Sequence, residues 1–450
     1  MSESLTCTCV VAGGGPAGVM AGFLLARAGV DVIVLEKHAD FFRDFRGDTI
    51  HPSTLEVMGE LGLLDDFLKV PHQKIEYGEA EIGTEKFRVA DLTHLPTRCK
   101  FIAFMPQWDF LNFLAAQGKR LPCFRLMMGT EATDPLRQGD RQDERVVGVT
   151  ANSPSGPIDI RADLVIGADG RHSRLREAAG LKLDDIGAPM DVLWFRLERR
   201  ADEEHAVLGR FLDGQLLVML DRNDYWQCAL IIRKGTFDAV KQAGLAAFQA
   251  RVAQLARRDK VDGIKSFDDV KLLTVAVDRL PEWSRPGLLF IGDAAHAMSP
   301  IGGVGINLAV QDAIAAANIL AEPLRRHGVT LADLRRVQKR RAFPTWATQA
   351  MQVTIQNKVI DPMLASGKTP KVPALLRLMQ RWPFLQRIPA RVLGMGFRPE
   401  HVLTSPRRGE VGARSAAGEG GAVCLATPRV RFCPAMREKV SKNLTANKQG

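Results

Sequence analysis

A glycine-rich turn near the N-terminus constrains the fold of this 450-residue chain more than any other feature. The turn spans residues 13–18 and follows residues 5–12, which are mostly small, β-branched or apolar. Residues 19–28 are rich in Ala and Leu, and residues 31–35 read Asp-Val-Ile-Val-Leu. These patterns predict a buried strand, a tight turn, a helix and a second buried strand. The chain therefore begins with a βαβ unit, which is typical of a parallel sheet covered by helices.

The residues of this turn suit a phosphate-binding role. Gly13 permits the tight turn, Gly15 lets the backbone approach a pyrophosphate, and Gly18 lets helix and strand pack closely. Pro16 and Ala17 stand at the start of the helix, where unpaired N–H groups and the positive end of the helix dipole attract phosphate. A purely structural glycine turn is the alternative.

An acidic residue closes the second predicted strand. Glu36 lies 18 residues after Gly18, where its carboxylate can accept hydrogen bonds from ribose hydroxyls. Lys37, the next residue, is predicted to belong to the same site. Together these residues predict an adenine dinucleotide, but they do not separate FAD from NAD.

A second motif lies far along the chain. Residues 288–291 predict another buried strand, followed by Gly292 and Asp293 and then by the segment Pro-Ile-Gly-Gly-Val-Gly-Ile-Asn from Pro300 to Asn307. A carboxylate at a strand end can hold a second sugar hydroxyl, and bare N–H groups that open a helix can stabilise an electron-rich ring edge. In isolation, a second structural turn would explain the stretch equally well.

A third motif, Asp169-Gly170, follows the predicted strand 164–166. Alone it is explained by a strand-to-helix turn with Ser173 as the helix cap. Its position between the other two motifs favours a functional role. His296 is predicted to orient the turn after Asp293 and not to act in catalysis.

In this order and spacing, the three motifs resemble those of the class A FAD-dependent aromatic monooxygenases, the p-hydroxybenzoate hydroxylase-like family. The resemblance covers roughly residues 5–402. It implies that Asp293 binds the ribityl chain and that Asp169 serves both FAD and NAD(P)H. It also implies cofactor contacts by Arg46 and Gln107. Further implied contacts lie against the isoalloxazine ring, namely Pro300, Gly303, Gly305, Ile306 and Asn307.

The resemblance also implies a reaction. NADPH or NADH reduces FAD, and O₂ then forms a C4a-hydroperoxyflavin that hydroxylates a small hydrophobic aromatic or polycyclic substrate. Because the cofactor carries this chemistry, no catalytic side chain is predicted. One departure is the scarcity of tyrosine, with Tyr77 and Tyr225 alone, so a pocket of Phe, Trp and Met is expected. A reductase of the prenyl-reductase type and a non-catalytic flavoprotein remain as alternatives.

The expected architecture is α/β: a Rossmann-like FAD-binding domain with an inserted mixed β-sheet substrate domain and C-terminal helices. Long helices are expected over residues 237–257 and 331–358, the latter kinked or broken at Pro344. The predicted division assigns 1–73, 105–188 and 281–405 to the FAD-binding part, 74–104 and 189–280 to the substrate part, and 406–450 to a disordered tail.

The charge of +10 is unevenly distributed. Residues 406–450 hold nine Arg or Lys and three Glu, so they contribute +6 and the body only +4. No nucleic-acid partner is therefore expected. Seven cysteines without a Cys-x-x-Cys pair, no signal-peptide pattern and no apolar run long enough for a bilayer indicate a cytoplasmic protein without a metal site. Basic and apolar residues alternate over 371–398, which leaves membrane-surface contact open against the simpler reading of short solvated segments.

Overall fold

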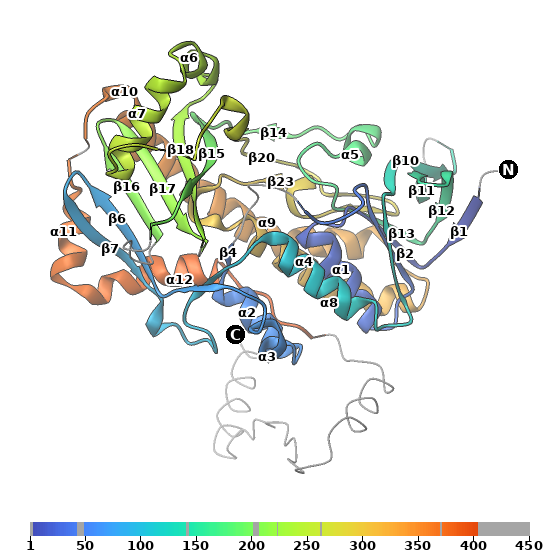
Figure 1. The fold of residues 1–450 in the computed structure, drawn as a ribbon. Helices are drawn as coiled ribbons and strands as arrows, with labels where there is room; N and C mark the ends of the chain where they lie inside the picture. Colours follow the sequence, from blue (N-terminus) through green and yellow to red (C-terminus); the bar gives the residue numbers. More distant parts are fainter. Residues whose placement is uncertain are drawn as a thin grey trace, which may run out of the picture. The chain divides into compact units, whose positions relative to one another are not determined.

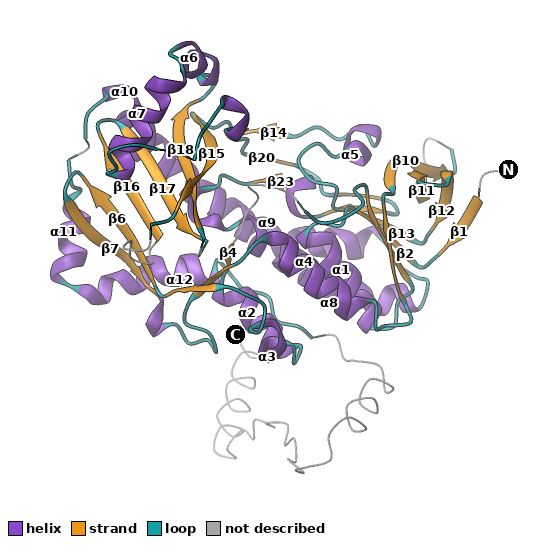
Figure 2. Ribbon diagram, in the orientation of Figure 1, coloured by secondary structure: helices purple, strands orange, loops and turns teal. Residues whose placement is uncertain are grey.

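The computed structural model describes residues 3–42, 49–140, 144–200, 207–222, 224–261, 263–369 and 371–403. Two predicted features, Arg46 and the disordered tail 406–450, lie outside these residues. Two larger sheets dominate the fold, with helices packed along them (Figures 1 and 2). The mixed α/β class predicted from the sequence is confirmed.

The first of these sheets is the Rossmann-like part. Its neighbouring strands run parallel except at β21, and its central strands are fully buried, as expected for a sheet covered on both faces. Helices α1 (Pro16–Arg27), α4 (Gln107–Gly118) and α8 (Gly305–Arg325) pack together beside it. The strand order is β21 (Ser284–Arg285), β22 (Leu288–Phe290), β13 (Leu164–Gly167), β2 (Cys9–Ala12), β3 (Val32–Glu36), β9 (Phe124–Met128).

The single strand predicted over residues 5–12 is wrong in one respect, because the structure has two strands there. The first, β1, belongs to a separate four-stranded sheet. The backbone N–H of Cys7 donates to the Arg161 carbonyl (3.0 Å), whereas that of Cys9 donates to the Asp31 carbonyl (3.0 Å). The chain therefore changes its partner strand within two residues. This sheet consists of β1 (Glu3–Thr6), β12 (Gly156–Arg161), β11 (Arg145–Ser153) and β10 (Glu131–Gln138).

The second large sheet has seven strands and is mixed, since β6 pairs with β16 in parallel while its other pairs are antiparallel. It is the inserted sheet that the sequence predicted. One face packs against α7 (Leu245–Ala256) through a core that includes Phe195 and Phe248. Its strands are β19 (Lys271–Leu273), β15 (Met190–Glu198), β18 (Tyr225–Arg233), β17 (Gln215–Asp221), β16 (Val207–Leu212), β6 (Tyr77–Ile82) and β7 (Glu85–Asp91).

Two predicted long helices differ from expectation. The helix expected over 237–257 is two helices, α6 (Phe237–Gln242) and α7 (Leu245–Ala256), because Gly244 has a φ of +89° that a helix cannot accommodate. In contrast, α9 (Leu331–Ile355) is not broken at Pro344. It lies against α8 and continues into a π-helical turn (Gln356–Ile360), so packing outweighs the single hydrogen bond that proline removes.

The remaining elements are short. Within the described residues, the C-terminal segment forms three separate α-helices, α10, α11 and α12: α10 ends at the left-handed Gly367, and Pro383 begins the short turn after α11, whereas Pro389 lies in the first turn of α12, where proline is tolerated. The stretch Ile301–Arg325 is long and apolar enough to cross a membrane, but 83% of its apolar window is buried within the protein. The other elements are β4 (Thr49–Ile50), α2 (Pro52–Glu60), α3 (Leu64–Phe67), β5 (Gln73–Ile75), β8 (Ile102–Phe104), α5 (Arg174–Ala178), β14 (Asp184–Asp185), β20 (Asp278–Arg279), β23 (His296–Ala297), α10 (Asp361–Ser366), α11 (Ala374–Arg381) and α12 (Arg387–Met395).

Candidate active site

The three sequence motifs meet at one edge of the six-stranded sheet. Strands β2, β13 and β22 are adjacent and parallel, and each runs directly into one motif. Gly13 follows β2, Asp169 follows β13 by two residues, and Gly292 follows β22 by two residues. Ligands of open α/β sheets bind outside the carboxyl ends of the strands. Segments far apart in sequence therefore form one candidate site.

The glycines of the first motif are required by close backbone contacts. Gly13 has a φ of +110°, and a Cβ atom there would lie 2.3 Å from the carbonyl oxygen of Ala168. A Cβ on Gly18 would lie 1.8 Å from the Gly13 carbonyl oxygen. In contrast, a Cβ on Gly15 would meet nothing within 4 Å. Gly13 and Gly18 therefore let the turn pack closely against the backbone, and Gly15 leaves space at the start of α1.

The carboxylate of Glu36 is fixed at the same edge. Its two oxygens accept hydrogen bonds from the backbone N–H groups of Gly14 (3.1 Å) and His38 (3.0 Å). A Cβ on Gly14 would lie 2.7 Å from the Glu36 Cβ, so Gly14 is also constrained. Gly14 was not among the predicted site residues, although it stands in the middle of the run of three glycines. Lys37 is exposed.

The second and third motifs are joined by an arginine that the sequence analysis missed. Arg171 Nε donates to Asp293 Oδ2 (3.1 Å), and Arg171 Nη2 donates to the carbonyl of Met298 (3.3 Å). Arg176 in turn donates to the carbonyls of Ala294 (2.8 Å) and Arg171 (2.6 Å). Both arginines stand in the segment that follows Asp169-Gly170, and this position was the available signal. They hold the Asp293 turn against the Asp169 loop.

Asp169 itself is largely buried. Burial raises the pKa of its carboxyl group, while hydrogen bonds from Ser173 and from the backbone oppose that rise. Among the described residues, its Oδ1 has no hydrogen-bond partner. Ser173 accepts a hydrogen bond from the backbone N–H of Arg176 (3.0 Å), which makes it the cap of α5. Ser173 therefore has the predicted structural role as a helix cap. Asp169 keeps one buried oxygen that can accept a hydrogen bond from a ligand.

A buried ionic network of Asp312, His296 and Arg341 holds the turn that contains Asp293. Asp312 Oδ2 accepts from the backbone N–H of Gly292 (3.1 Å) and lies 2.6 Å from His296 Nε2, while Arg341 Nε donates to Asp312 Oδ1 (2.9 Å). Burial opposes ionisation of Asp312, but the charges and hydrogen bonds of His296 and Arg341 hold its pKa below the usual value. His296 thus orients the turn, as its predicted role requires.

The segment from Pro300 to Asn307 forms a glycine turn at the start of α8. Gly302 and Gly303 have φ of +78° and +62°, and a Cβ on Gly303 would lie 2.5 Å from Thr49 Oγ1. A Cβ on Gly305 would meet nothing within 4 Å, so the N-terminus of α8 is as open as that of α1. Ile306, the next residue, is buried.

The side chain of Asn307 is already engaged. Its Oδ1 accepts from the His51 backbone N–H (2.8 Å) and from Thr54 Oγ1 (2.8 Å), and its Nδ2 donates to the Thr49 carbonyl (3.1 Å). Because its side chain is engaged, Asn307 can contact a cofactor only through its backbone N–H, and this contact remains a prediction. The side chain instead ties the segment before α2 to the first turn of α8.

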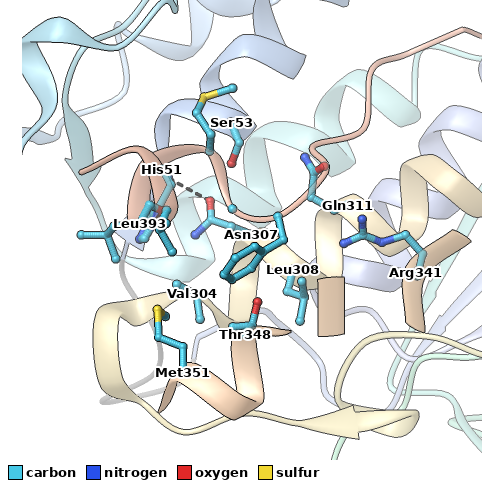
Figure 3. A pocket seen from close by; sticks show the side chains of 14 residues that line it. His51, Ser53, Val304, Asn307, Leu308, Gln311, Arg341, Thr348, Met351 and Leu393 are labelled. Carbon is cyan, nitrogen blue, oxygen red and sulfur yellow. Dashed lines mark hydrogen bonds between the residues drawn. The ribbon is translucent and has the colours of Figure 1, made fainter. Parts of the chain in front are cut away.

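A small cavity of about 30 Å³ lies beside this turn (Figure 3). Val304, which caps α8, and Leu308 and Gln311 of α8 line one side, with Leu393 of α12 and Met351 of α9 around them. This volume suits water, because one water needs roughly 10–15 Å³, and it is too small for an aromatic ring. The cavity is therefore not the substrate pocket.

His51 also lines this cavity. Its Nδ1 lies 2.7 Å from the Leu393 carbonyl, and burial lowers the pKa of its imidazole to about 4. His51 is thus neutral at pH 7 and serves in packing rather than as a charged group.

One face of the seven-stranded sheet carries apolar side chains that pack in the same cluster as Ile301. Trp194, Ala229 and Val218 form a row across β15, β18 and β17. Trp194 and Val218 pack both in the cluster that contains Ile301, next to Pro300, and in the cluster that contains Leu393 of α12. Within the described residues, the buried Trp194 Nε1 has no hydrogen-bond partner. This face therefore combines apolar side chains with one unpaired N–H donor.

The other predicted site residues are placed as follows. Gln107 is the first residue of α4 and is half-buried. The guanidinium carbon of Arg196 lies 4.8 Å from the centre of the Tyr225 ring, and that of Arg88 lies 3.8 Å from the centre of the Tyr77 ring. Both tyrosines are thus engaged with arginines at the sheet.

The residues at this edge fit FAD. Two glycine-opened helix N-termini supply N–H groups, Glu36 and Asp293 supply carboxylates for hydroxyl groups, and Asp169 retains a buried acceptor oxygen. Within the described residues, no three His, Cys, Asp or Glu side chains gather as a metal site. The chemistry of the donor set is that of a dinucleotide site.

Comparison with known proteins agrees with this geometry. The sequence profile of the FAD binding domain family matches residues 6–351. The chain is 32% identical over 394 residues to a 6-methylpretetramide 4-monooxygenase from Streptomyces rimosus. The alignment covers 86% of this chain and 92% of that protein. It is 26% identical over 352 residues to a para-nitrophenol 4-monooxygenase from a Pseudomonas species, covering 74% and 83%.

A solved structure shares the fold. An anhydrotetracycline hydroxylase from Streptomyces rimosus aligns with a TM-score of 0.69 at 21% identity, covering 87% of this chain and 76% of that one. The family match spans most of the chain and includes all three motifs. The chain is therefore an FAD-dependent, NAD(P)H-using monooxygenase and belongs to the class A FAD-dependent aromatic monooxygenase family.

Proposed function

We propose that this monooxygenase hydroxylates a polycyclic aromatic, polyketide-like substrate that lies between the Pro300–Gly303 turn and the Trp194–Val218 face of the seven-stranded sheet. The observation that carries the proposal is that Trp194 and Val218 border two apolar clusters, one that Ile301 also borders and one that Leu393 also borders. The names of the S. rimosus relatives, a 6-methylpretetramide 4-monooxygenase and an anhydrotetracycline hydroxylase, support a fused-ring substrate. The domain boundaries and the individual cofactor contacts predicted above, and the cytoplasmic location, remain part of this proposal.

Each part of the site has a separate task. The glycine turn at Gly13–Gly18 and Glu36 bind the adenine half of FAD, and Asp293, balanced by Arg171, binds its sugar-alcohol chain. Bound FAD supplies hydride acceptance from NAD(P)H and oxygen activation. The apolar sheet face excludes water, which protects a reactive oxygen species from loss to solvent.

Trp194 gives the substrate its orientation. An indole N–H buried without a partner costs free energy, and a phenol or ketone oxygen of the substrate would satisfy it. Polycyclic polyketides carry such oxygens along the ring edge. The donor thereby selects which ring carbon faces the flavin.

The test is Trp194→Phe, which removes the N–H and keeps an aromatic ring. We expect KM for the substrate to rise about 5-fold, as the loss of one hydrogen bond implies, and more NAD(P)H to be consumed without product. FAD content should not change. The matched control is Trp346→Phe on α9, whose side chain is 52% exposed.

An unchanged KM and unchanged coupling of NAD(P)H use to product in Trp194→Phe would refute this placement. Oxygen uptake measured with fused-ring phenols and quinones tests the reaction itself. Flavin reduction without oxygen-dependent product would indicate a reductase instead.

A further inference from the structure

Five large apolar side chains are exposed within 14 residues near the end of the described chain. Twelve large hydrophobic side chains are exposed among the described residues, so this short segment holds nearly half of them. They belong to α11, the turn after it and α12, which lie along β7 (Figure 1). The exposed fractions are 62% for Leu375, 39% for Leu378, 50% for Trp382, 58% for Phe384 and 64% for Ile388.

The exposed apolar residues of α11 form a stripe along one side of the helix. Leu375, Leu378 and Trp382 stand at positions i, i+3 and i+7, so they follow one side of the helix. Met379 is buried and anchors the helix to the body. The Trp382 and Phe384 rings lie nearly parallel with centres 6.5 Å apart, so the stripe continues into the next turn.

Positive charge surrounds this apolar stripe. Between Asp361 and Glu400 the sequence contains seven Arg or Lys and no acidic residue. Arg377 and Arg381 stand at i and i+4 on α11, beside the stripe, and both are exposed. Three more exposed basic residues flank it, namely Lys371, Arg387 and Arg391.

We propose that this surface, formed by residues 371–391, docks the enzyme on an anionic lipid membrane. Exposed Leu, Ile, Phe and Trp side chains beside arginines match the two layers of a membrane interface, an apolar one beneath a negatively charged one. Tryptophan in particular is enriched at that boundary. The inference goes beyond the hydroxylation reaction, and its test does not depend on activity.

Other occupants fit less well. A second copy of the chain would bring the same arginines against one another across a two-fold axis. The C-terminal residues 406–450 carry a net charge of +6, which does not complement a basic surface. A negatively charged partner is required, and the five protruding apolar side chains favour lipid over an acidic protein.

The docking surface adjoins the proposed substrate site. Ile388 faces outward from α12, whereas Ala390 and Leu393 of the same helix belong to the apolar cluster that contains Trp194. A hydrophobic substrate dissolved in the membrane would therefore reach the protein next to the sheet face described above. This gives the membrane contact a role in substrate supply.

The experiment is co-sedimentation of the FAD-loaded full-length protein with phosphatidylcholine vesicles, with and without phosphatidylglycerol. We expect binding to the anionic vesicles that high salt weakens. The double variant Arg377→Glu/Arg381→Glu should weaken binding at least about 30-fold, since the loss of each basic residue near an anionic surface costs about 1 kcal/mol, or about fivefold, and the new negative charges add repulsion. The matched control is Arg335→Glu/Lys339→Glu, which makes the same charge change on exposed positions of α9.

A second measurement tests the apolar stripe. Vesicles with brominated lipid chains should quench tryptophan fluorescence in the wild-type protein, and this quenching should be lost in Trp382→Ser but not in Trp346→Ser. Absence of binding to anionic vesicles would overturn the proposal. So would equal weakening by the control variant, or binding only to an acidic protein.

Discussion

Replacing Asp312 by Asn tests whether the buried ionic network stabilises the fold and the Asp293 turn. Asp312 is fully buried, and its partners His296 and Arg341 are each 1% exposed. Removing one partner of a buried ion pair typically costs about 3–5 kcal/mol, because the remaining charge stays buried without compensation. We expect the free energy of unfolding to fall by about 3 kcal/mol, a large share of the roughly 5–15 kcal/mol of a typical protein.

The assay is urea unfolding followed by circular dichroism at several pH values. Because the folded pKa of Asp312 lies below its unfolded value of about 3.9, its contribution is present above that pH. The contribution is lost as the pH falls through the folded pKa, so the difference between wild type and variant should shrink in acid. The control is Asp66→Asn, an exposed residue paired with Lys69, which should leave stability unchanged.

A loss below about 1 kcal/mol at pH 7, on the scale of a single ordinary hydrogen bond, would refute the reasoning. A difference that stays constant into acid would refute the assigned charge state. A second readout is FAD retention, which should decrease because the Gly292 N–H loses a charged acceptor.

Two further predictions concern the cofactor. Gly13→Ala should abolish FAD retention, because the added Cβ would lie 2.3 Å from the carbonyl oxygen of Ala168. The control Gly156→Ala has a similar φ of +119° but open space around the added Cβ, so it should retain FAD. Equal flavin absorbance at 450 nm per protein in the two variants would contradict the packing argument. Asp293→Ala should lower FAD affinity about tenfold or more in titrations of the apoprotein, by loss of a charge-assisted hydrogen bond, and it leaves Arg171 unpaired; an unchanged dissociation constant would exclude the assigned role.

Much of the cofactor site follows from local patterns in the sequence. The glycine turn, Glu36 and the Gly292-Asp293 motif each stand at the end of an apolar run, and parallel strands present their ends at one edge. Glycine spacing, strand periodicity and an acidic residue at a fixed distance are short-range signals, so they can be recognised without the fold. The family resemblance then predicted the reaction, and the comparisons confirm it.

Other features depend on contacts between distant segments. The break between β1 and β2 arises because Arg161 and Asp31 offer carbonyls on different sheets. Arg171 was missed because its carboxylate partner lies 122 residues away. The engagement of Asn307 by Thr49 and Thr54 likewise links residues more than 250 positions apart.

The sequence by itself therefore predicted a dinucleotide site at Gly13–Gly18 and Glu36, because the turn and helix geometry are local properties. Tertiary structure decided how that site is held and where it faces. The Asp312–Arg341 pair beside Gly292 and the cluster that Trp194 and Ile301 border exist only once separate elements pack together. The same holds for the apolar stripe of α11, because a sequence pattern shows which residues are apolar but not which of them stay in water.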